Sequence, residues 1–261
     1  MTSLPKRTAA PLSRRNLRWS SGLVLMAYVT MHLVNHATGL LSLDAGETVL
    51  RWAAALWHSL PGTLALYGAA IVHIALAFSA LWERRTLRMP ASQLLRIGLG
   101  LSLPLLLASH LAATRGMHTL FGFEASYAHM VRNLWDADGW WQMLIMVVAW
   151  THGCMGLHFA LRQRPVWHRA QPLLLSAAVV LPLLAGLGFL SMGREVQARA
   201  VASRQPSPEA SAVLRSAADA GRAGYAFGLA ALFTALALRR RSERSGARTI
   251  TLTYPDRTAK V

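Results

Sequence analysis

The sequence predicts an all-α membrane protein, built as a six-transmembrane-helix bundle. The first observation is composition: of 261 residues, 54% are hydrophobic and 15% are charged, a balance that soluble domains rarely show. The second is a positive mean hydropathy of +0.33. The third is that the charges fall in short clusters between long uncharged segments, which is the pattern of membrane spans and their connections.

Six segments without Asp, Glu, Lys or Arg define the predicted spans. A helix needs about 20 apolar residues to cross a bilayer core. The segments are 19–43, 52–82, 97–114, 139–161, 170–193 and 223–238. The last is the shortest, but Arg222 and Arg239 extend it because their charged heads can reach the interface.

Local signals place the ends and kinks of these spans. Residues 59–62 (SLPG) predict the entry into the second span, and residues 207–209 (SPE) predict a helix start before the sixth. Pro104 and Pro182 lie inside the third and fifth spans, where membrane helices tolerate proline as a kink.

The net charge of +16 follows the predicted topology. Basic residues gather before the first span, after the second, after the fourth and after the sixth. The positive-inside rule then places both termini in the cytoplasm of a multi-pass protein, which we expect in the bacterial inner membrane. Basic residues at span ends do not form one continuous patch, so we expect no nucleic-acid partner. The predicted parts are a cytoplasmic tail (1–16), a six-helix membrane domain (17–240) and a second cytoplasmic tail (241–261).

Histidines inside the spans are the candidate functional residues, because ionisable groups at membrane depth are seldom retained without a role. The histidines within spans are His32, His36, His73, His110, His152 and His158. Their depth in the membrane, counted from the nearest cytoplasmic arginine, divides them into groups. His32 lies 14 residues beyond Arg18, and His110 lies 14 residues beyond Arg96. At a rise of about 1.5 Å per residue, both lie roughly 21 Å from the same side.

A second pair lies at a shallower level. His73 precedes Arg84 by 11 residues, and His152 precedes Arg162 by 10, which gives depths of about 15 to 17 Å. Two pairs at two depths are what two stacked haems with two axial histidines each require, and bundle cores commonly hold cofactors. Neutral imidazole is a good iron ligand that brings no charge into the bilayer. Two axial ligands favour electron transfer because no open position remains.

Alternatives remain for these residues. His36 follows His32 by one turn on the same face, so it either replaces His32 as a ligand or hydrogen-bonds beside it; depth favours His32. All of these histidines could also be interhelical hydrogen-bond partners worth about 1 kcal/mol each, with no metal. Cys154 is the sole cysteine, which excludes a cysteine-based zinc site, a four-cysteine cluster and thioether-linked haem.

The strings around the four depth-matched histidines resemble the di-haem cytochrome b membrane anchor of succinate dehydrogenases and quinol:fumarate reductases. The matching pieces are residues 21–23 (SGL) before His32, 71–77 (IVHIALA), 108–111 (ASHL) and 151–158 (THGCMGLH). The resemblance implies two b haems. It also implies that His32 and His110 ligate the haem far from the cytoplasm, and that His73 and His152 ligate the near one.

The C-terminal part departs from that family, whose anchor has five helices. A sixth span here returns the chain to the cytoplasm, so we expect a cytoplasmic domain to follow. Residues 248–256 alternate like a strand and resemble the opening strand of a plant-type [2Fe-2S] ferredoxin. The arrangement is similar to bacterial class III adenylate cyclases that carry a di-haem anchor and a ferredoxin domain. The other interpretation of this tail is a disordered basic end.

The predicted function is electron exchange with quinone or quinol in the lipid, on behalf of a cytoplasmic redox partner or of ferredoxin and cyclase domains. Such a chain is an electron-transfer anchor rather than a complete enzyme, and it contains no ATP-binding loop of a cyclase. A haem-free anchor that dimerises a cytoplasmic enzyme is the competing hypothesis, and a homodimer fits either one. By position alone, the candidates for the quinone site are Asp44, Glu47, Arg51 and Trp52. Candidates for contacts to the haem propionates are Arg115 and Tyr127.

Overall fold

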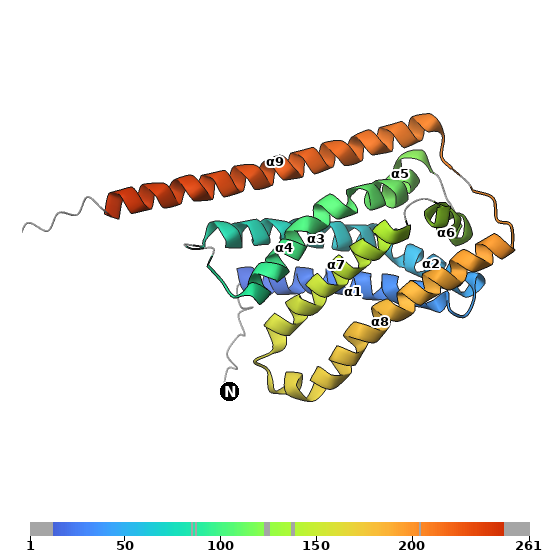
Figure 1. Cartoon of the computed structure of the whole chain (residues 1–261), viewed down its shortest axis with the longest axis horizontal. Coiled ribbons are helices and arrows are strands. Elements are labelled where there is room, and N and C mark those ends of the chain that lie inside the picture. Colours follow the sequence, from blue (N-terminus) through green and yellow to red (C-terminus); the bar gives the residue numbers. More distant parts are fainter. Residues whose placement is uncertain are drawn as a thin grey trace, which may run out of the picture.

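The computed structural model describes residues 13–84, 86, 88–122, 126–136, 139–203 and 205–247, with side chains described up to residue 243. Within these residues every regular element is helical (Figure 1). The long helices are α1 (Arg14–Thr38), α3 (Leu60–Trp82), α4 (Ala91–Leu111), α7 (Gly139–Leu161), α8 (Pro165–Ala198) and α9 (Pro208–Ala247). The short ones are α2 (Leu43–Trp57), the π-helix η1 (Ala112–Gly116), α5 (Met117–Phe121) and α6 (Tyr127–Asp136).

Five helical stretches are long and apolar enough to cross a membrane, as a multi-pass membrane protein requires. They correspond to the second through sixth predicted spans. Their bounds are Leu60–Trp82, Ala91–Phe121, Gly139–Leu161, Pro165–Ala198 and Pro208–Glu243. The first predicted span is α1, which has 25 residues but lies outside this set. Polar residues such as Asn35 lower its average hydropathy.

Helix α1 packs along α3 and α8 and also contacts α7. Leu33 and Asn35 are both only 2% exposed, so the polar side of α1 faces other helices rather than lipid. Gly188 of α8 permits this approach, because a Cβ at that position would collide with the carbonyl group of His36. Polar side chains in a membrane helix are favourable where protein surrounds them.

Serine side chains cap the N-termini of several helices. The sequence predicts the helix starts at two of them, Ser59 and Ser207. Ser59 Oγ accepts from the Gly62 N–H at 3.1 Å at the start of α3. Ser207 Oγ accepts from the Ala210 N–H at 3.2 Å at the start of α9. These caps satisfy amide donors that a helix start leaves without an intrahelical partner. Pro104 and Pro182 lie inside α4 and α8, as predicted.

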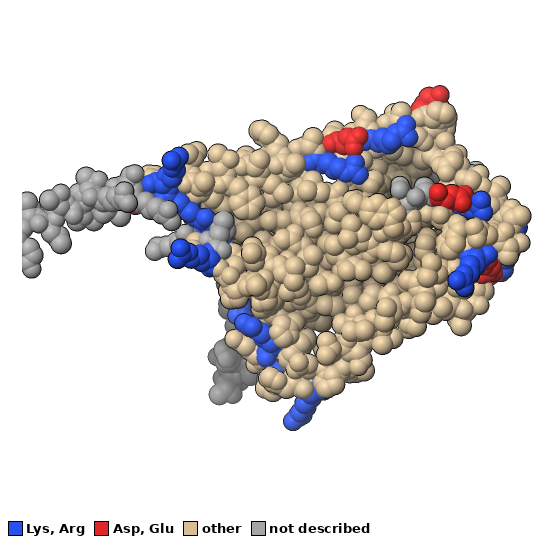
Figure 2. All heavy atoms as spheres, in the orientation of Figure 1, with Lys and Arg blue, Asp and Glu red and all other residues tan. Residues whose placement is uncertain are grey.

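Charged residues lie mainly towards the two ends of the bundle (Figure 2). At one end Arg14 forms an ion pair with Glu83, and Arg239 donates to the Arg84 carbonyl at 3.2 Å. The start of α1 and the end of α3 therefore lie at the same level as residue 239 of α9. The opposite end holds the carboxylates of Asp44, Glu47, Asp136 and Glu195, each beside a basic residue or a backbone N–H.

The predicted start of the second span is wrong. Residues 44–51, which separate the first two predicted spans, belong to helix α2, and the second span begins at Leu60 rather than at residue 52. Helix α1 begins at Arg14 and α9 continues to Ala247, so each runs a few residues into a predicted tail; the division into tails and membrane domain stays a prediction. The strand predicted for residues 248–256 lies outside the described residues.

Candidate functional site

The two deepest histidines of the sequence analysis lie together in the bundle. His32 of α1 and His110 of α4 have ring centres 6.0 Å apart, and their planes are inclined at 81°. His32 and His110 lie equally far along the chain from Arg18 and Arg96, and the structure places their rings side by side. Their role as ligands stays a prediction.

The shallower histidines form the second pair. His73 of α3 and His152 of α7 have ring centres 6.3 Å apart with planes at 90°. Helix α1 packs on α3, and α4 packs on α7, whereas in the described part of the chain α1 does not pack on α4, nor α3 on α7. Each histidine pair thus bridges two helices whose backbones stand apart across the bundle.

These separations fit two imidazoles on a single iron. A metal–imidazole bond is about 2 Å long, so two axial imidazoles have nitrogens about 4 Å apart and ring centres about 6 Å apart. Both pairs have that ring spacing. By ring spacing, the two histidines at each level would fit a group held between them.

Hydrogen bonds fix the orientation of the second pair. His152 Nδ1–H donates to the Arg96 carbonyl oxygen at 3.0 Å, and a carbonyl can only accept. His73 Nδ1 lies 3.3 Å from Ser21 Oγ, whose own proton goes to the Arg18 carbonyl at 3.2 Å. The Ser21 oxygen therefore accepts from His73. Both rings keep the Nε2 lone pair available, as metal-binding histidines do.

The first pair is held differently. His110 Nδ1–H donates to Gln142 Oε1 of α7 at 2.9 Å, which again keeps Nε2 available. His32 has no such amide partner among the described contacts; its Nε2 lies 3.3 Å from Nε2 of His36. Tyr28 stacks on the His32 ring with centres 6.0 Å apart and planes at 12°.

His36 is placed beside the first pair rather than within it. Its Nε2 lies near His32, and its Nδ1 lies 2.6 Å from the hydroxyl of Tyr127. Both nitrogens of His36 are thereby engaged. Tyr127 is only 4% exposed, and this burial raises the pKa of its hydroxyl, so the group stays protonated. The Nε2–Nε2 contact engages His32 and His36 alike, so the Tyr127 contact at Nδ1 is what favours the alternative in which His36 supports His32.

Two glycines make room for the rings of the second pair. A Cβ on Gly100 of α4 would collide with the His152 ring, and one on Gly22 of α1 would lie 3.2 Å from His73 Cε1. Glycine at these positions lets a neighbouring helix pass directly against an imidazole. Gly98, two residues before Gly100, faces open space.

The predicted propionate contacts lie near the first pair. Arg115 of η1 donates to Thr63 Oγ1 at 2.9 Å, and its guanidinium lies 5.9 Å from the centre of the Tyr67 ring. Tyr127 points its hydroxyl at His36. Arg115 is thus a cation within the apolar helical stretch that carries His110.

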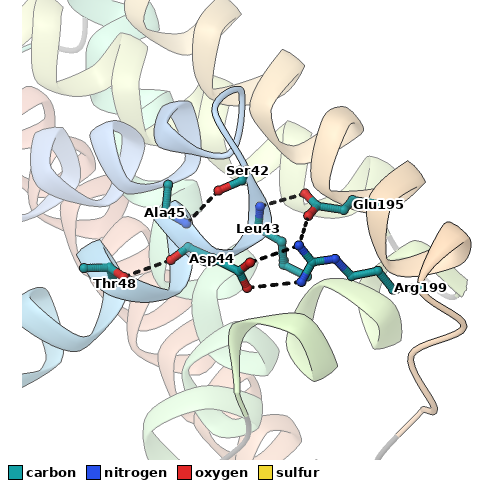
Figure 3. Close-up of polar contacts among 7 residues, drawn as sticks. All are labelled: Ser42, Leu43, Asp44, Ala45, Thr48, Glu195 and Arg199. Atoms are coloured by element: carbon teal, nitrogen blue, oxygen red, sulfur yellow. Dashed lines mark hydrogen bonds and ion pairs between the residues drawn. The ribbon is translucent and has the colours of Figure 1, made fainter.

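The predicted quinone residues are spread along α2 and already have partners. Asp44 forms a two-point ion pair with Arg199 at 3.0 and 3.1 Å (Figure 3). The Arg199 guanidinium lowers the pKa of the Asp44 carboxyl through this hydrogen bond and its charge. Glu47 accepts from the Tyr127 N–H at 2.5 Å. Arg51 contacts Thr48 at 3.5 Å, and Trp52 is 77% exposed.

The remaining histidines lie outside the two pairs. The rings of His58 and His118 lie 4.7 Å apart near the end of α2. His158 lies near the end of α7 and packs against Trp167, with ring centres 5.3 Å apart. His129 Nδ1 lies 2.6 Å from Ser126 Oγ.

Sequence reasoning missed the groups that orient the rings. The sequence does not predict Gln142 or the Arg96 carbonyl as partners of the rings, and it marks Ser21 only through the string at residues 21–23. A usable signal for Gln142 exists, because an amide inside an apolar span needs a hydrogen-bonding partner. A backbone carbonyl leaves no such trace in a sequence.

Comparisons with protein-family models, with curated proteins and with solved structures found no match for this chain. The function is therefore argued from the two histidine pairs.

Proposed function

We propose that this chain is a membrane di-haem b electron-transfer module that exchanges electrons with quinone or quinol. His32 and His110 hold the distal haem, and His73 and His152 hold the proximal one. The observation that carries this proposal is the pair of ring separations, 6.0 and 6.3 Å, at two levels of one bundle. A resemblance to the anchors of succinate dehydrogenases and quinol:fumarate reductases supports it.

Haem held by two histidines supplies reversible one-electron transfer at a closed iron centre. The chain contributes everything else. Ser21, Arg96 and Gln142 hold the Nδ1 protons of three imidazoles and point Nε2 away from those partners. The surrounding apolar helices keep water from the rings, and Arg115 offers a cation for a propionate near the distal level.

The proposed topology has six spans, with α1 as the first, and both termini in the cytoplasm of the bacterial inner membrane. Helix α1 has 25 residues, enough to cross, and its polar side chains face protein. The end of the bundle that carries Arg14, Arg84 and Arg239 is then cytoplasmic, in line with the positive-inside rule. The distal pair lies towards the outer side.

Partners follow from this orientation. Quinone or quinol reacts at the distal level, and the proximal level faces a cytoplasmic redox partner. We further propose that the chain is the redox-sensing anchor of ferredoxin and adenylate cyclase domains, in which case its haem state reports on the quinone pool.

A dithionite-reduced minus oxidised absorbance spectrum of the detergent-purified chain, with a pyridine haemochrome assay, tests the proposal. We expect two b haems per chain. His32→Ala or His110→Ala should remove one haem, and His73→Ala or His152→Ala the other. His168→Ala, at an exposed position outside both pairs, is the matched control and should keep both.

A second candidate function is a haem-free anchor that dimerises a cytoplasmic enzyme. Gly224 and Gly228 of α9 favour it, because they form a GxxxG spacing on a face with nothing within 4 Å of an added Cβ. If dimerisation uses this face, Gly224→Leu and Gly228→Leu should weaken the dimer in light-scattering measurements, whereas Gly98→Leu on α4 should not. Protein without haem, made with ample haem supply, would favour this candidate.

A further inference from the structure

Gln142 is an amide side chain in a helix whose neighbouring residues pack as apolar groups. Its Oε1 accepts the Nδ1–H of His110 at 2.9 Å, and the bond joins α7 to α4. Met143 beside it packs against the apolar cluster around Phe189 and Met192. The packing of α7 therefore does not explain why residue 142 is a glutamine.

The acceptor of an Nδ1–H changes the properties of the imidazole. A strong acceptor makes Nε2 more electron-donating, and a more basic ligand stabilises the oxidised form of a bound metal. The hydrogen bond to an axial histidine is thus one of the features by which a protein sets a haem potential.

The acceptor differs between the two levels. His73 and His152 use the Ser21 hydroxyl and the Arg96 carbonyl, whereas only His110 of the described pairs reaches a side-chain amide. A change at Gln142 therefore alters one level of the bundle, and a change at Ser21 alters the other.

We propose that Gln142 is a positioning residue that holds His110 and sets the reduction potential of the distal haem. This inference rests on the proposed function. It predicts that the two potentials can be changed independently, through Gln142 at the distal level and Ser21 at the proximal level.

The test is a potentiometric titration of the purified chain, followed by haem absorbance and by the electron paramagnetic resonance of the oxidised form. Gln142→Leu removes the acceptor and should raise the potential of one component. Gln142→Glu strengthens the acceptor and should lower the same component. Ser21→Ala is the matched control and should shift only the other component. The His73→Ala variant, which keeps the distal haem, identifies the components.

The outcomes separate the two proposals. A wild-type chain without haem overturns the proposed function itself. Two haems with unchanged potentials in both Gln142 variants, or equal shifts of both components, overturn only the role of Gln142. Selective loss of the distal haem from Gln142→Leu supports the positioning of His110. If Gln142→Leu does not accumulate, Gln142→Met takes its place as the variant without an acceptor. The lowered potential expected in Gln142→Glu tests the role of Gln142 in either case.

Discussion

The His152 ring is held from two directions, by the Arg96 carbonyl and by the bare backbone of Gly100. The first contact fixes which nitrogen carries the proton. The second leaves no room for even a methyl group beside the ring. A residue without a side chain is therefore as important to this imidazole as its hydrogen-bond partner.

Gly100→Ala is expected to displace the His152 ring and remove the proximal haem while the distal haem remains. The new Cβ would overlap the imidazole, and a misplaced ring cannot bind axially. The haemochrome assay measures the loss as a fall from two haems to one. Gly98→Ala, on the same helix with open space around it, should keep both. Full haem content in Gly100→Ala would contradict the view that the ring needs a bare backbone at this position.

His36→Leu is expected to keep two haems per chain, whereas His32→Leu should keep one. His36 already contacts His32 with one nitrogen and the Tyr127 hydroxyl with the other. Haem counts for the two variants, measured side by side, distinguish the ligand from its neighbour. Loss of a haem from His36→Leu alone would reverse the assignment.

Counting residues from the arginines predicts which histidines meet, because the rise of a helix is nearly constant. His32 with His110 and His73 with His152 follow from that count alone. The count cannot predict Gln142, since the partner of a ring depends on how far each helix is rotated about its own axis. Helix rotation is set by packing of many side chains, which a single sequence does not display.

At the scale of elements, the start of α2 is tied to the end of α8. Glu195 Oε2 accepts the Leu43 N–H at 2.7 Å, and Arg199 bridges Glu195 and Asp44 (Figure 3). A carboxylate at a helix N-terminus satisfies a free amide and interacts favourably with the helix dipole. Helix α2 does not stand out as an uncharged segment because it is amphipathic. Its charged residues, Asp44, Glu47 and Arg51, lie on one side of the helix.

Glu195→Gln should lower the free energy of unfolding by about 1 kcal/mol, the usual contribution of a helix cap. The amide retains the size of the side chain but removes the negative charge from Leu43 N–H and Arg199. Thermal unfolding in detergent measures the change. Glu243→Gln, on α9 at the far end of the bundle, is the control. Equal stabilities would mean that the charge of Glu195 contributes nothing measurable to holding α2.

The Asp44–Arg199 pair should make stability depend on pH. Arg199 lowers the pKa of Asp44 in the folded chain, so the pair stabilises it above the ordinary pKa of aspartate and this contribution is lost as pH falls through the folded-state pKa. We expect Asp44→Asn to melt slightly below wild type at neutral pH, with the difference vanishing in acid. The pair is exposed, so the effect is small. A difference that grows in acid would contradict this assignment.

For the whole molecule, the proposed direction of insertion rests on the distribution of charge. Arg14, Arg84 and Arg239 lie at one end, and most of the described carboxylates lie at the other (Figure 2). The sequence predicted this separation correctly because span ends are marked by charge. The sequence does not rank α1 among the most apolar helices. Because α1 packs against α3, α7 and α8, it can carry polar side chains.

A fluorescent reporter fused after residue 261 should fluoresce in the cytoplasm, and alkaline phosphatase inserted between α8 and α9 should be active in the periplasm. Both results follow if the end of the bundle carrying Arg14 and Arg239 faces the cytoplasm. An active phosphatase at the C-terminus would reverse the orientation or remove one span. A phosphatase insertion between α3 and α4 is the inactive control.

Helix α9 is one rod of 40 residues, about 60 Å long. Near its start Leu214 lies against Gly116 of η1, and in its middle the Tyr225 hydroxyl donates to the Leu101 carbonyl at 3.0 Å. A rod held near its start and its middle would turn a small tilt into a larger displacement of its far end. A tilt of about 5° around Tyr225 would carry Ala247 sideways by about 3 Å, so a slight change in the contacts of α9 with η1 and α4 would be a larger displacement at the opposite end of the bundle.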